Sequence, residues 1–144
     1  MVEIKLKMLE GAKAPEYQSS GAAGADLYSL LEEDVIIHPG STVLVPTGVF
    51  IQIPLGYEAQ IRPRSGLALN NGITLLNTPG TIDSDYRGEI KVIMINLGKN
   101  NFTVTNHMRI AQMIFSRVYR GNFQQTSELN DTERGSKGFG HTGI

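Results

Sequence analysis

The sequence predicts an all-β domain of short strands with one short helix. Its apolar residues favour a period of two or short β-branched runs, which are typical of strands. Turn-forming residues recur roughly every 8–12 positions, a spacing typical of β-sandwiches and barrels. A domain of many short strands has sheet edges to cover. Closure into a jelly-roll-like β-barrel, or assembly with other copies of the chain, would cover them.

The expected strands follow one another in separate stretches of the chain. "VEIKLKM" alternates apolar and charged residues, and "DVIIHPGSTVLVPTGVFIQIPLG" is a series of β-branched runs interrupted by proline and glycine. "EIKVIMINLG" and "RIAQMIFSRVY" are two further runs of strand length. Only "SGLALNNG" looks helical, with Ser65 as a candidate cap and Gly72 as the stop signal.

One domain followed by a tail is the expected organisation. A chain of 144 residues is long enough for one domain with a core and too short for two comfortable ones. We expect the core over residues 1–120. Residues 121–144 are polar and glycine-rich with few apolar anchors, so they are predicted to form a flexible C-terminal arm.

Charge and composition exclude several classes of function. The formal net charge is −1 with acids and bases mixed, so we expect no stable binding of nucleic acid or of an anionic membrane. The chain has no cysteine, which excludes disulfides, thiolate metal sites and a cysteine nucleophile. The first residues lack the apolar run of a signal peptide, and no later segment could span a bilayer. These features predict a cytoplasmic protein.

Turn formers and acids are concentrated in "NTPGTIDSDYRGEI", residues 77–90, between two apolar segments. The pattern predicts a β-hairpin with a polar tip. An ordinary solvated loop is one interpretation. The other is that Asp83 lies beside a pocket, where it could take a proton from water or bind a sugar hydroxyl. Tyr86 would then offer its face to a ring, while free main-chain groups could bind the edge of a base.

Two further segments contain donors for phosphate. In "RPRSGLALNNG", Arg62 and Arg64 precede Ser65-Gly66 at the start of the expected helix, which suits an anion, although a capped helix with surface arginines explains the same residues. In "RGSKGFGHTG", residues 134–143, basic and hydroxyl side chains alternate with glycines that let the backbone approach phosphate. Disorder alone is the default interpretation of that composition.

The remaining polar residues give weaker signals. Asp26 follows the small residues of "GAAGADLYS", which a tight turn alone would explain. His38 and His107 have no partner at ligand spacing, so we expect surface residues and no zinc site. Taken together, phosphate donors, a carboxylate, two aromatic residues and a glycine-rich arm indicate nucleotide binding with phosphoryl chemistry.

Five segments of the chain resemble the motifs of one family, the trimeric deoxyuridine triphosphatases (dUTPases). They are "AGADLYS" at 23–29, "RPRSGLA" at 62–68, "NTPGTIDSDYRGE" at 77–89, "RIAQMIF" at 109–115 and "RGSKGFGHTG" at 134–143. Their order and gaps match, and the match extends over almost the whole chain. The resemblance implies a jelly-roll-like homotrimer with three active sites at subunit interfaces. It also implies magnesium-assisted hydrolysis of dUTP to dUMP and pyrophosphate, which keeps uracil out of DNA and supplies dUMP for thymidylate synthesis.

The resemblance also implies roles for residues of the 77–91 segment. Its main chain would bind uracil with help from Asn77. Tyr86 would pack under the deoxyribose and leave no room for a 2′-hydroxyl, and Asp83 would activate the attacking water. The substrate-binding residues implied here are Asn77, Thr81, Ile82, Asp83, Tyr86 and Lys91. Thr81 departs from the aliphatic residue more usual in the family, which matters little if the main chain makes the contact.

The same resemblance implies which residues bind the phosphates and the metal. Arg64, Ser65 and Gly66 of a second subunit would hold phosphates, Gln112 would contact the phosphate region, and Asp26 would place Mg²⁺ through its water shell. The arm of a third subunit would close the site, with Phe139 stacked on uracil. The residues implied in the arm are Arg134, Ser136, Lys137, Phe139, Gly140 and Thr142.

Three alternatives differ in chemistry. Deoxycytidine triphosphate deaminase resembles the family in fold, but Ile93 stands where its catalytic glutamate is expected, and isoleucine cannot move a proton. A non-enzymatic dUTP sensor would bind the nucleotide without turnover. A purely structural jelly-roll trimer would not need Asp83, Tyr86 and the arm together.

Overall fold

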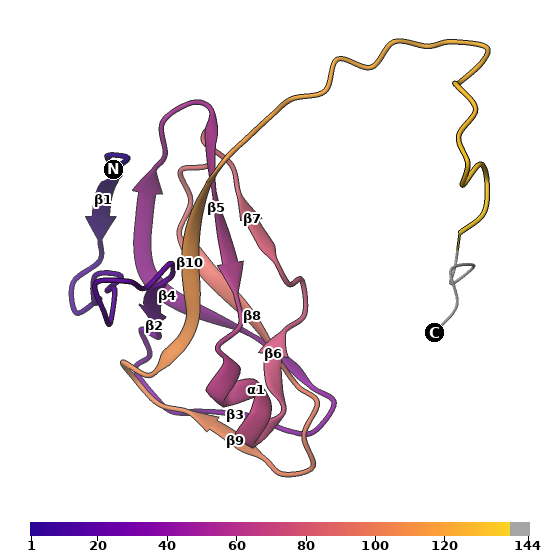
Figure 1. The fold of residues 1–144 in the computed structure, drawn as a ribbon. Helices are drawn as coiled ribbons and strands as arrows, with labels where there is room; N and C mark the ends of the chain where they lie inside the picture. Colours follow the sequence, from indigo (N-terminus) through magenta and orange to yellow (C-terminus); the bar gives the residue numbers. More distant parts are fainter. Residues whose placement is uncertain (139–144) are drawn as a thin grey trace.

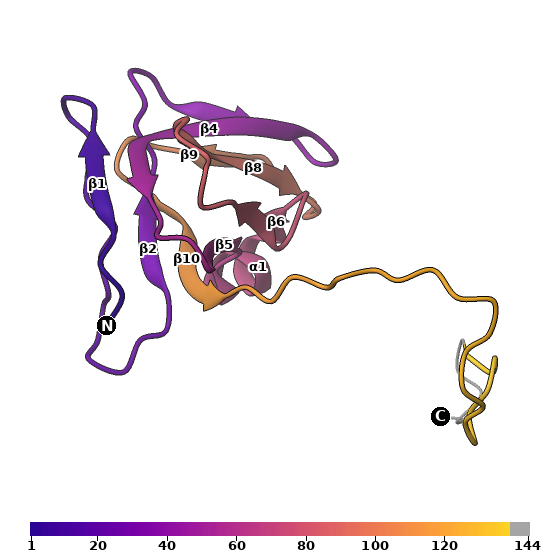
Figure 2. The ribbon, with the colours of Figure 1, turned by 90° about the horizontal axis from the view of Figure 1, so that it is seen from above.

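The computed structural model describes residues 1–138, which form two four-stranded sheets, a two-stranded sheet and one short helix (Figure 1). Figure 2 shows β4 and β8 in one layer and β10 and β5 in the facing one. The elements in chain order are β1 (Lys5–Met8), β2 (Ala25–Tyr28), β3 (Val35–Ile37), β4 (Thr42–Gln52), β5 (Tyr57–Arg62), α1 (Ser65–Asn71), β6 (Ile73–Leu75), β7 (Gly80–Ile82), β8 (Ile90–Asn96), β9 (Phe102–Val104) and β10 (Arg109–Arg117).

All paired strands are antiparallel, in the orders β1-β4-β8-β6, β2-β10-β5-β7 and β3-β9. The expectation of an all-β domain with a single short helix is therefore confirmed for the described residues. The sheets are separate, and their pairing does not close into a continuous barrel within residues 1–138. No helix in that range is long and apolar enough to cross a membrane.

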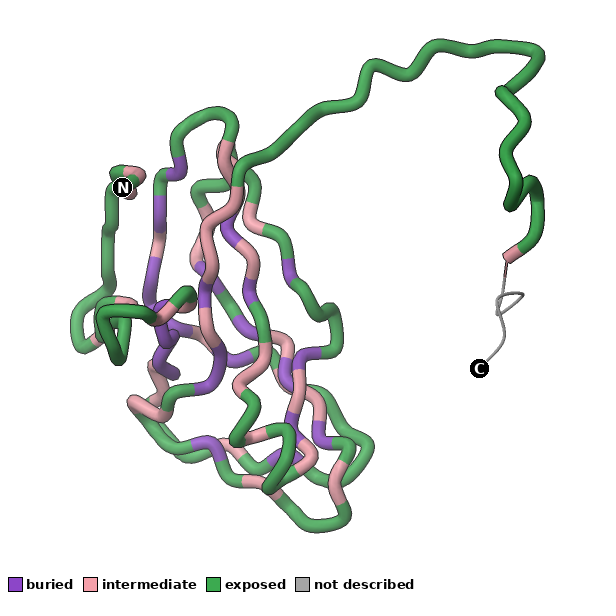
Figure 3. Tube along the Cα trace, in the orientation of Figure 1, coloured by how far each residue is buried: buried purple, intermediate pink, exposed green. Residues whose placement is uncertain are grey.

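The core lies between the two large sheets. Along β8 the burial alternates, so Val92 and Met94 point into the core while Lys91 points out. Leu27 of β2, Val45 of β4 and Ala111 of β10 are fully buried in the same cluster. Burying one such aliphatic side chain fully contributes about 1.5–3 kcal/mol, so this cluster is what holds the sheets together. Figure 3 shows that buried positions follow the strands, while the chain after β10 is exposed.

The helix α1 ends where the sequence predicts, but its N-terminus is not capped as predicted. Its stop signal is confirmed, because Gly72 has a left-handed φ of 69° and donates its N–H to the carbonyls of Leu67 and Ala68. The predicted cap is wrong: Ser65 is the first helical residue, and Arg64 precedes it without a side-chain cap. The Arg64 side chain is occupied elsewhere, in an ion pair with Asp26.

The predicted hairpin over residues 77–90 is more complex than a two-stranded turn. The flanking apolar segments do pair, since Ile73 lies opposite Asn96 and Leu75 opposite Met94 in β6 and β8. Between them, however, β7 leaves this sheet and pairs with β5 of the other one. The sequence does not predict this, because a strand of three residues has too short an alternating pattern to specify which sheet it joins.

The chain from Val118 to Gly138 contains no helix or strand and is exposed at almost every residue. It leaves β10 and runs away from both sheets (Figures 1 and 2). The N–H of Val118 donates to the Gly56 carbonyl at 2.9 Å, close to where the regular structure ends. The division into residues 1–120 and 121–144 and the flexibility of the arm remain predictions.

Candidate active site

A charged pocket is built around Asp26 on β2. The side chain of Asp26 is 10% exposed, and its two oxygens lie 3.2 Å from Arg64 Nε and 3.2 Å from Arg109 Nη1. A carboxylate this far from water requires such partners. Two guanidinium groups against one carboxylate leave a local excess of positive charge, which favours a bound phosphate. The hollow has a volume of about 280 Å³ and includes Ser65, Gly66 and Gln112 in its lining.

Chain segments far apart in sequence meet at this pocket. Asp26 lies opposite Gln112 in the β2–β10 pair, and Gln112 lies opposite Arg62 in the β10–β5 pair. Pairing therefore brings three of the quoted motifs side by side. Arg64 also donates from Nη1 to the Arg109 carbonyl at 3.1 Å, which holds the start of α1 against β10. Ser65 and Gly66 are exposed at that start and line the pocket.

Gln112 is held in place by its surroundings. Its Nε2 donates to the Pro63 carbonyl at 3.0 Å, so the amide joins β10 to the turn before α1. Gly24 leaves the room that this arrangement needs, because a Cβ there would collide with Gln112 Oε1. At Gly24 a small residue is thus favoured by close packing against Gln112 and not by a turn alone.

A second hollow, of about 380 Å³, lies where β7 and β8 diverge into different sheets. We call it the β7–β8 slot. Its lining residues are Leu44, Ile82, Tyr86, Glu89, Lys91 and Ile93. β7 pairs only with β5, and β6 pairs with β8 only from Met94 onward, so the facing edges of β7 and of the start of β8 have no ladder partner among the described residues. Main-chain donors and acceptors at such edges can bind the edge of a planar base.

Tyr86 is fixed beside the slot by two contacts. Its hydroxyl donates to the Glu89 carbonyl at 2.9 Å. Its ring lies so close to Gly88 that a Cβ there would collide with it. The N–H of Tyr86 donates to the Asp83 carbonyl at 3.1 Å, and Arg87 Nη1 donates to the Ser84 carbonyl at 2.7 Å. The polar tip is therefore a hydrogen-bonded turn and not a loose loop.

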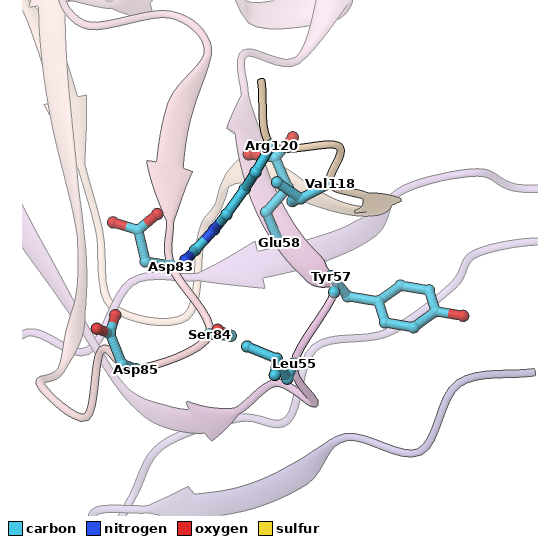
Figure 4. Close-up of a pocket in the computed structure, with 9 residues that line it drawn as sticks. Leu55, Tyr57, Glu58, Asp83, Ser84, Asp85, Val118 and Arg120 are labelled. Carbon is cyan, nitrogen blue, oxygen red and sulfur yellow. The ribbon is translucent and has the colours of Figure 1, made fainter. Parts of the chain in front are cut away.

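Asp83 itself lines a third hollow, of about 540 Å³, together with Glu58, Asp85 and Arg120. Figure 4 shows the Arg120 side chain extending toward Asp83, with Glu58 on the adjacent strand. Asp83 is exposed, so a carboxylate there is accessible to water and to a nucleotide. The same hollow is bounded by two residues that follow the end of β10, Val118 and Arg120.

The predicted site residues fall into separate groups within one chain. Asp83 follows Ile82, which is opposite Ala59 near the start of β5, whereas Arg64 follows the other end of β5. The six residues of β5 are separated by five steps of ~3.3 Å, which place its ends on the order of 17 Å apart. Asn77 and Thr81 are exposed on the same segment as Asp83.

The arm residues that can be placed lie apart from all three hollows. Arg134 donates from Nε to the Lys137 carbonyl at 2.9 Å, which makes a local turn, and Ser136 lies within that turn. Phe139, Gly140 and Thr142 lie outside the described residues, so their expected roles are not addressed by the structure.

Three residues of the site were not singled out by sequence reasoning. Arg109 stands within the quoted fourth motif, but nothing in its spacing shows that it pairs with Asp26. Gly24 stands within the first motif. Glu89 was one charge among several in the polar segment, and only the structure shows that it contacts β4.

The histidines and the other acids do not form a metal site among residues 1–138, where no group of three His, Cys, Asp or Glu is suitably placed. His38 is exposed as expected, whereas His107 is half-buried with a φ of 59° and its ring contacts the Gly11 carbonyl at 2.8 Å.

The pKa of Tyr28 is raised because the phenol is desolvated by burial and because its hydroxyl donates to Glu16.

Comparison with known proteins identifies the family. The family model of the dUTPases matches residues 10–143. The chain belongs to the dUTPase family. It is 57% identical to a deoxyuridine 5′-triphosphate nucleotidohydrolase of Caldanaerobacter subterraneus subsp. tengcongensis over 99% of both chains. It is 53% identical to the enzyme of that name from Treponema denticola, again over 99% of both chains.

Solved structures of dUTPases share the fold. A mutant dUTPase of Staphylococcus bacteriophage 80alpha, solved with dUpNHpp, matches with a TM-score of 0.89 and 23% identity over 99% of both chains. A mutant dUTPase from phage phi11 of S. aureus, solved with a structural Mg(II) ion, matches with a TM-score of 0.79 and 20% identity over 88% of this chain and 97% of that one. The expected jelly-roll-like fold is thereby confirmed.

Proposed function

We propose that this dUTPase hydrolyses dUTP to dUMP and pyrophosphate in the cytoplasm, in active sites shared between the subunits of a homotrimer. Family membership and relatives that carry the nucleotidohydrolase name support the reaction. The observation that carries the shared site is the separation within one chain of Asp83 from the Arg64–Asp26–Arg109 pocket, by on the order of 17 Å along β5. This separation supports a site in which another copy supplies one of the two groups to the same nucleotide.

In the proposed site the β7–β8 slot takes uracil. The unpaired edges of β7 and β8, including the main chain at Thr81, Ile82 and Lys91, bind the base, and Asn77 assists. Cytosine reverses the donor and acceptor at N3 and at the C4 substituent, so its binding would leave buried polar groups unpaired, which is strongly disfavoured. Tyr86 packs against the sugar and leaves no space for a 2′-hydroxyl.

The proposed reaction is an in-line attack of water on the α-phosphorus. Asp83 accepts the proton of that water and contacts the 3′-hydroxyl, a contribution on the order of 10²–10⁴-fold. Arg64, with the main chain of Ser65 and Gly66, holds the phosphates, while Gln112 completes the pocket. Position and charge stabilisation contribute most to phosphoryl transfer, because the protein forms no covalent bond.

The residues present suit Mg²⁺ held mainly by its substrate. Magnesium in nucleotide sites is bound by phosphate oxygens, water and one or two carboxylates. Asp26 lies in the phosphate pocket, and both of its oxygens are already ion-paired with arginines. It therefore suits an indirect role through metal-bound water. When bound, the ion would neutralise charge that develops on the phosphates.

The arm is proposed to close over the site of a neighbouring subunit. Phe139 would stack on uracil, and Arg134, Ser136, Lys137 and Thr142 would bind the β- and γ-phosphates, with Gly140 allowing close approach. Enclosure would exclude bulk water during the reaction. The exposure of residues 121–137 supports an arm that does not pack on its own core.

The test is pyrophosphate release from dUTP, dCTP, dTTP and UTP with Mg²⁺, for the wild type and for Asp83→Asn. Release from dUTP alone, lost in the variant, is expected. Tight binding of dUTP without release from any nucleotide would refute hydrolysis and favour a sensor. Deamination is disfavoured because Ile93, at the position of the deaminase glutamate, presents an aliphatic side chain to the slot.

A further inference from the structure

Glu89 connects the Tyr86 turn to strand β4. Its side chain is only 15% exposed. One carboxylate oxygen, Oε1, accepts the N–H of Gly48 at 2.8 Å, and the other, Oε2, lies 3.5 Å from Lys91 Nζ. Its backbone carbonyl accepts the hydroxyl of Tyr86 at 2.9 Å. A single residue thus contacts both β4 and the side chain proposed to recognise the sugar.

The contact to β4 falls at a break in the sheet. The β4–β8 register shifts between Pro46 and Val49, so Gly48 has no opposite residue in the ladder. Gly48 is buried and has a φ of 67°, and a Cβ there would lie 2.6 Å from Leu30 Cδ2. Its N–H needs an acceptor, because a buried unpaired N–H is costly. Glu89 supplies that acceptor in place of a ladder partner.

The bulge is itself held firmly from both sides. Thr47 donates its hydroxyl to the Ile90 carbonyl at 2.6 Å, next to Glu89 in the chain. The Gly48 carbonyl accepts the N–H of Leu9 at 2.9 Å. The bulge is therefore a fixed point of the core, and Glu89 ties the start of β8 to it.

The position of Tyr86 depends on the backbone that Glu89 anchors. The Tyr86 ring lies against Gly88, and its hydroxyl is bound to the Glu89 carbonyl. A shift of residues 88–89 would move the ring with them. The Tyr86 ring can exclude a 2′-hydroxyl only if the backbone that positions the ring does not move.

We infer that Glu89 is a positioning residue that sets the discrimination between deoxyribose and ribose nucleotides, by tying the turn that carries Tyr86 to the β4 bulge. This inference rests on the proposed function, in which Tyr86 excludes the 2′-hydroxyl. Glu89 does not contact the substrate in this scheme; it acts through Tyr86.

The test compares kcat/KM for dUTP and for UTP in the wild type, Glu89→Ala and Glu89→Gln. In Glu89→Ala the preference for dUTP over UTP is expected to fall about tenfold, equivalent to ~1.4 kcal/mol. Glu89→Gln keeps an oxygen for the Gly48 N–H, so its preference should stay close to that of the wild type. The inference is overturned if Glu89→Ala changes both substrates equally, or if glutamine behaves like alanine.

Val104→Ala is the matched control for lost stability. Val104 is fully buried on β9 and lines none of the three hollows. Its replacement should lower the melting temperature and leave the dUTP preference unchanged. If Glu89→Ala does not fold, Glu89→Asp takes its place, because it keeps the charge but shortens the side chain that accepts the Gly48 N–H. It should lower the preference in the same way, and an unchanged preference there overturns the inference.

The outcomes separate the two proposals. A wild type that releases no pyrophosphate from dUTP refutes the proposed function, and the inference with it. A wild type that prefers dUTP, with a Glu89→Ala variant that keeps the same preference, refutes the inference alone.

Discussion

The substitution Asp26→Asn tests the charged pocket for both stability and activity. Asparagine has nearly the same shape as aspartate but supplies one oxygen where aspartate supplies two. In the structure, the two oxygens each form an ion pair with a different guanidinium, at 3.2 Å from Arg64 and 3.2 Å from Arg109. At least one arginine therefore loses its acceptor, and neither keeps an opposite charge in this pair.

The size of the effect follows from how buried the three groups are. Asp26 is 10% exposed, while Arg64 is 27% and Arg109 is 43% exposed. Removing one partner of a fully buried pair costs ~3–5 kcal/mol, and an exposed pair is worth ~0–1 kcal/mol. Because both arginines reach water, we expect a loss of about 1–2 kcal/mol in unfolding free energy. For a chain of this length that lowers the melting temperature by about 2–8 °C.

Turnover should fall further than stability. Asp26 is the group proposed to place metal-bound water, and outer-sphere partners of a metal typically affect affinity or activity by about 10–100-fold. We expect kcat to fall within that range, with a larger Mg²⁺ requirement.

The assay is thermal unfolding at one fixed protein concentration, since oligomer stability depends on concentration, combined with Mg²⁺-dependent pyrophosphate release. Asp34→Asn, at an exposed position before β3, is the matched control and should change neither quantity. A variant at Asp26 that melts with the wild type and keeps its kcat would refute both the energetic argument and the role proposed for this carboxylate.

Three other perturbations address the remaining parts of the site. Asp83→Asn should lower kcat on the order of 10²–10⁴-fold while dUTP binding, measured by calorimetry, changes little; a large loss of binding with kcat retained would contradict a catalytic base. Truncation after Leu129 should leave a folded trimer by sedimentation with little activity, and full turnover would rule out closure by the arm. Gly24→Ala should displace Gln112, lowering the unfolding free energy by about 1–3 kcal/mol and raising KM for dUTP; crystallography showing Gln112 unmoved would disprove the packing argument.

The sequence predicted the secondary structure best where the local preference of a residue or of a short pattern decides it. Gly72 ends α1 as expected, because its left-handed φ of 69° is a local preference of glycine. The runs around Val92 and Ala111 form strands because their patterns of apolar residues suit a buried sheet. It failed at Ser65, where a side chain from the preceding position, Arg64, is drawn to Asp26 and the helix begins without a side-chain cap.

The candidate site was predictable as a set of motifs but not as an arrangement. The resemblance named Asp26, Arg64 and Gln112 together, and strand pairing does bring them to one pocket. The divergence of β7 and β8 into different sheets, which opens the slot, has no signal in a three-residue strand. Nor does any local pattern show that Glu89 binds Gly48, since the two are 41 residues apart.

The sequence by itself determined the fold class, the family and the inventory of chemical groups, because periodicity, turn residues and ordered motifs are local properties of the chain. The tertiary structure decided which groups meet. Antiparallel pairing placed Arg109 and Arg64 on Asp26, and a two-residue offset in β4 left Gly48 in need of the Glu89 carboxylate. Such contacts depend on burial and register over long separations in sequence, where the cost of an unpaired polar group selects the partner.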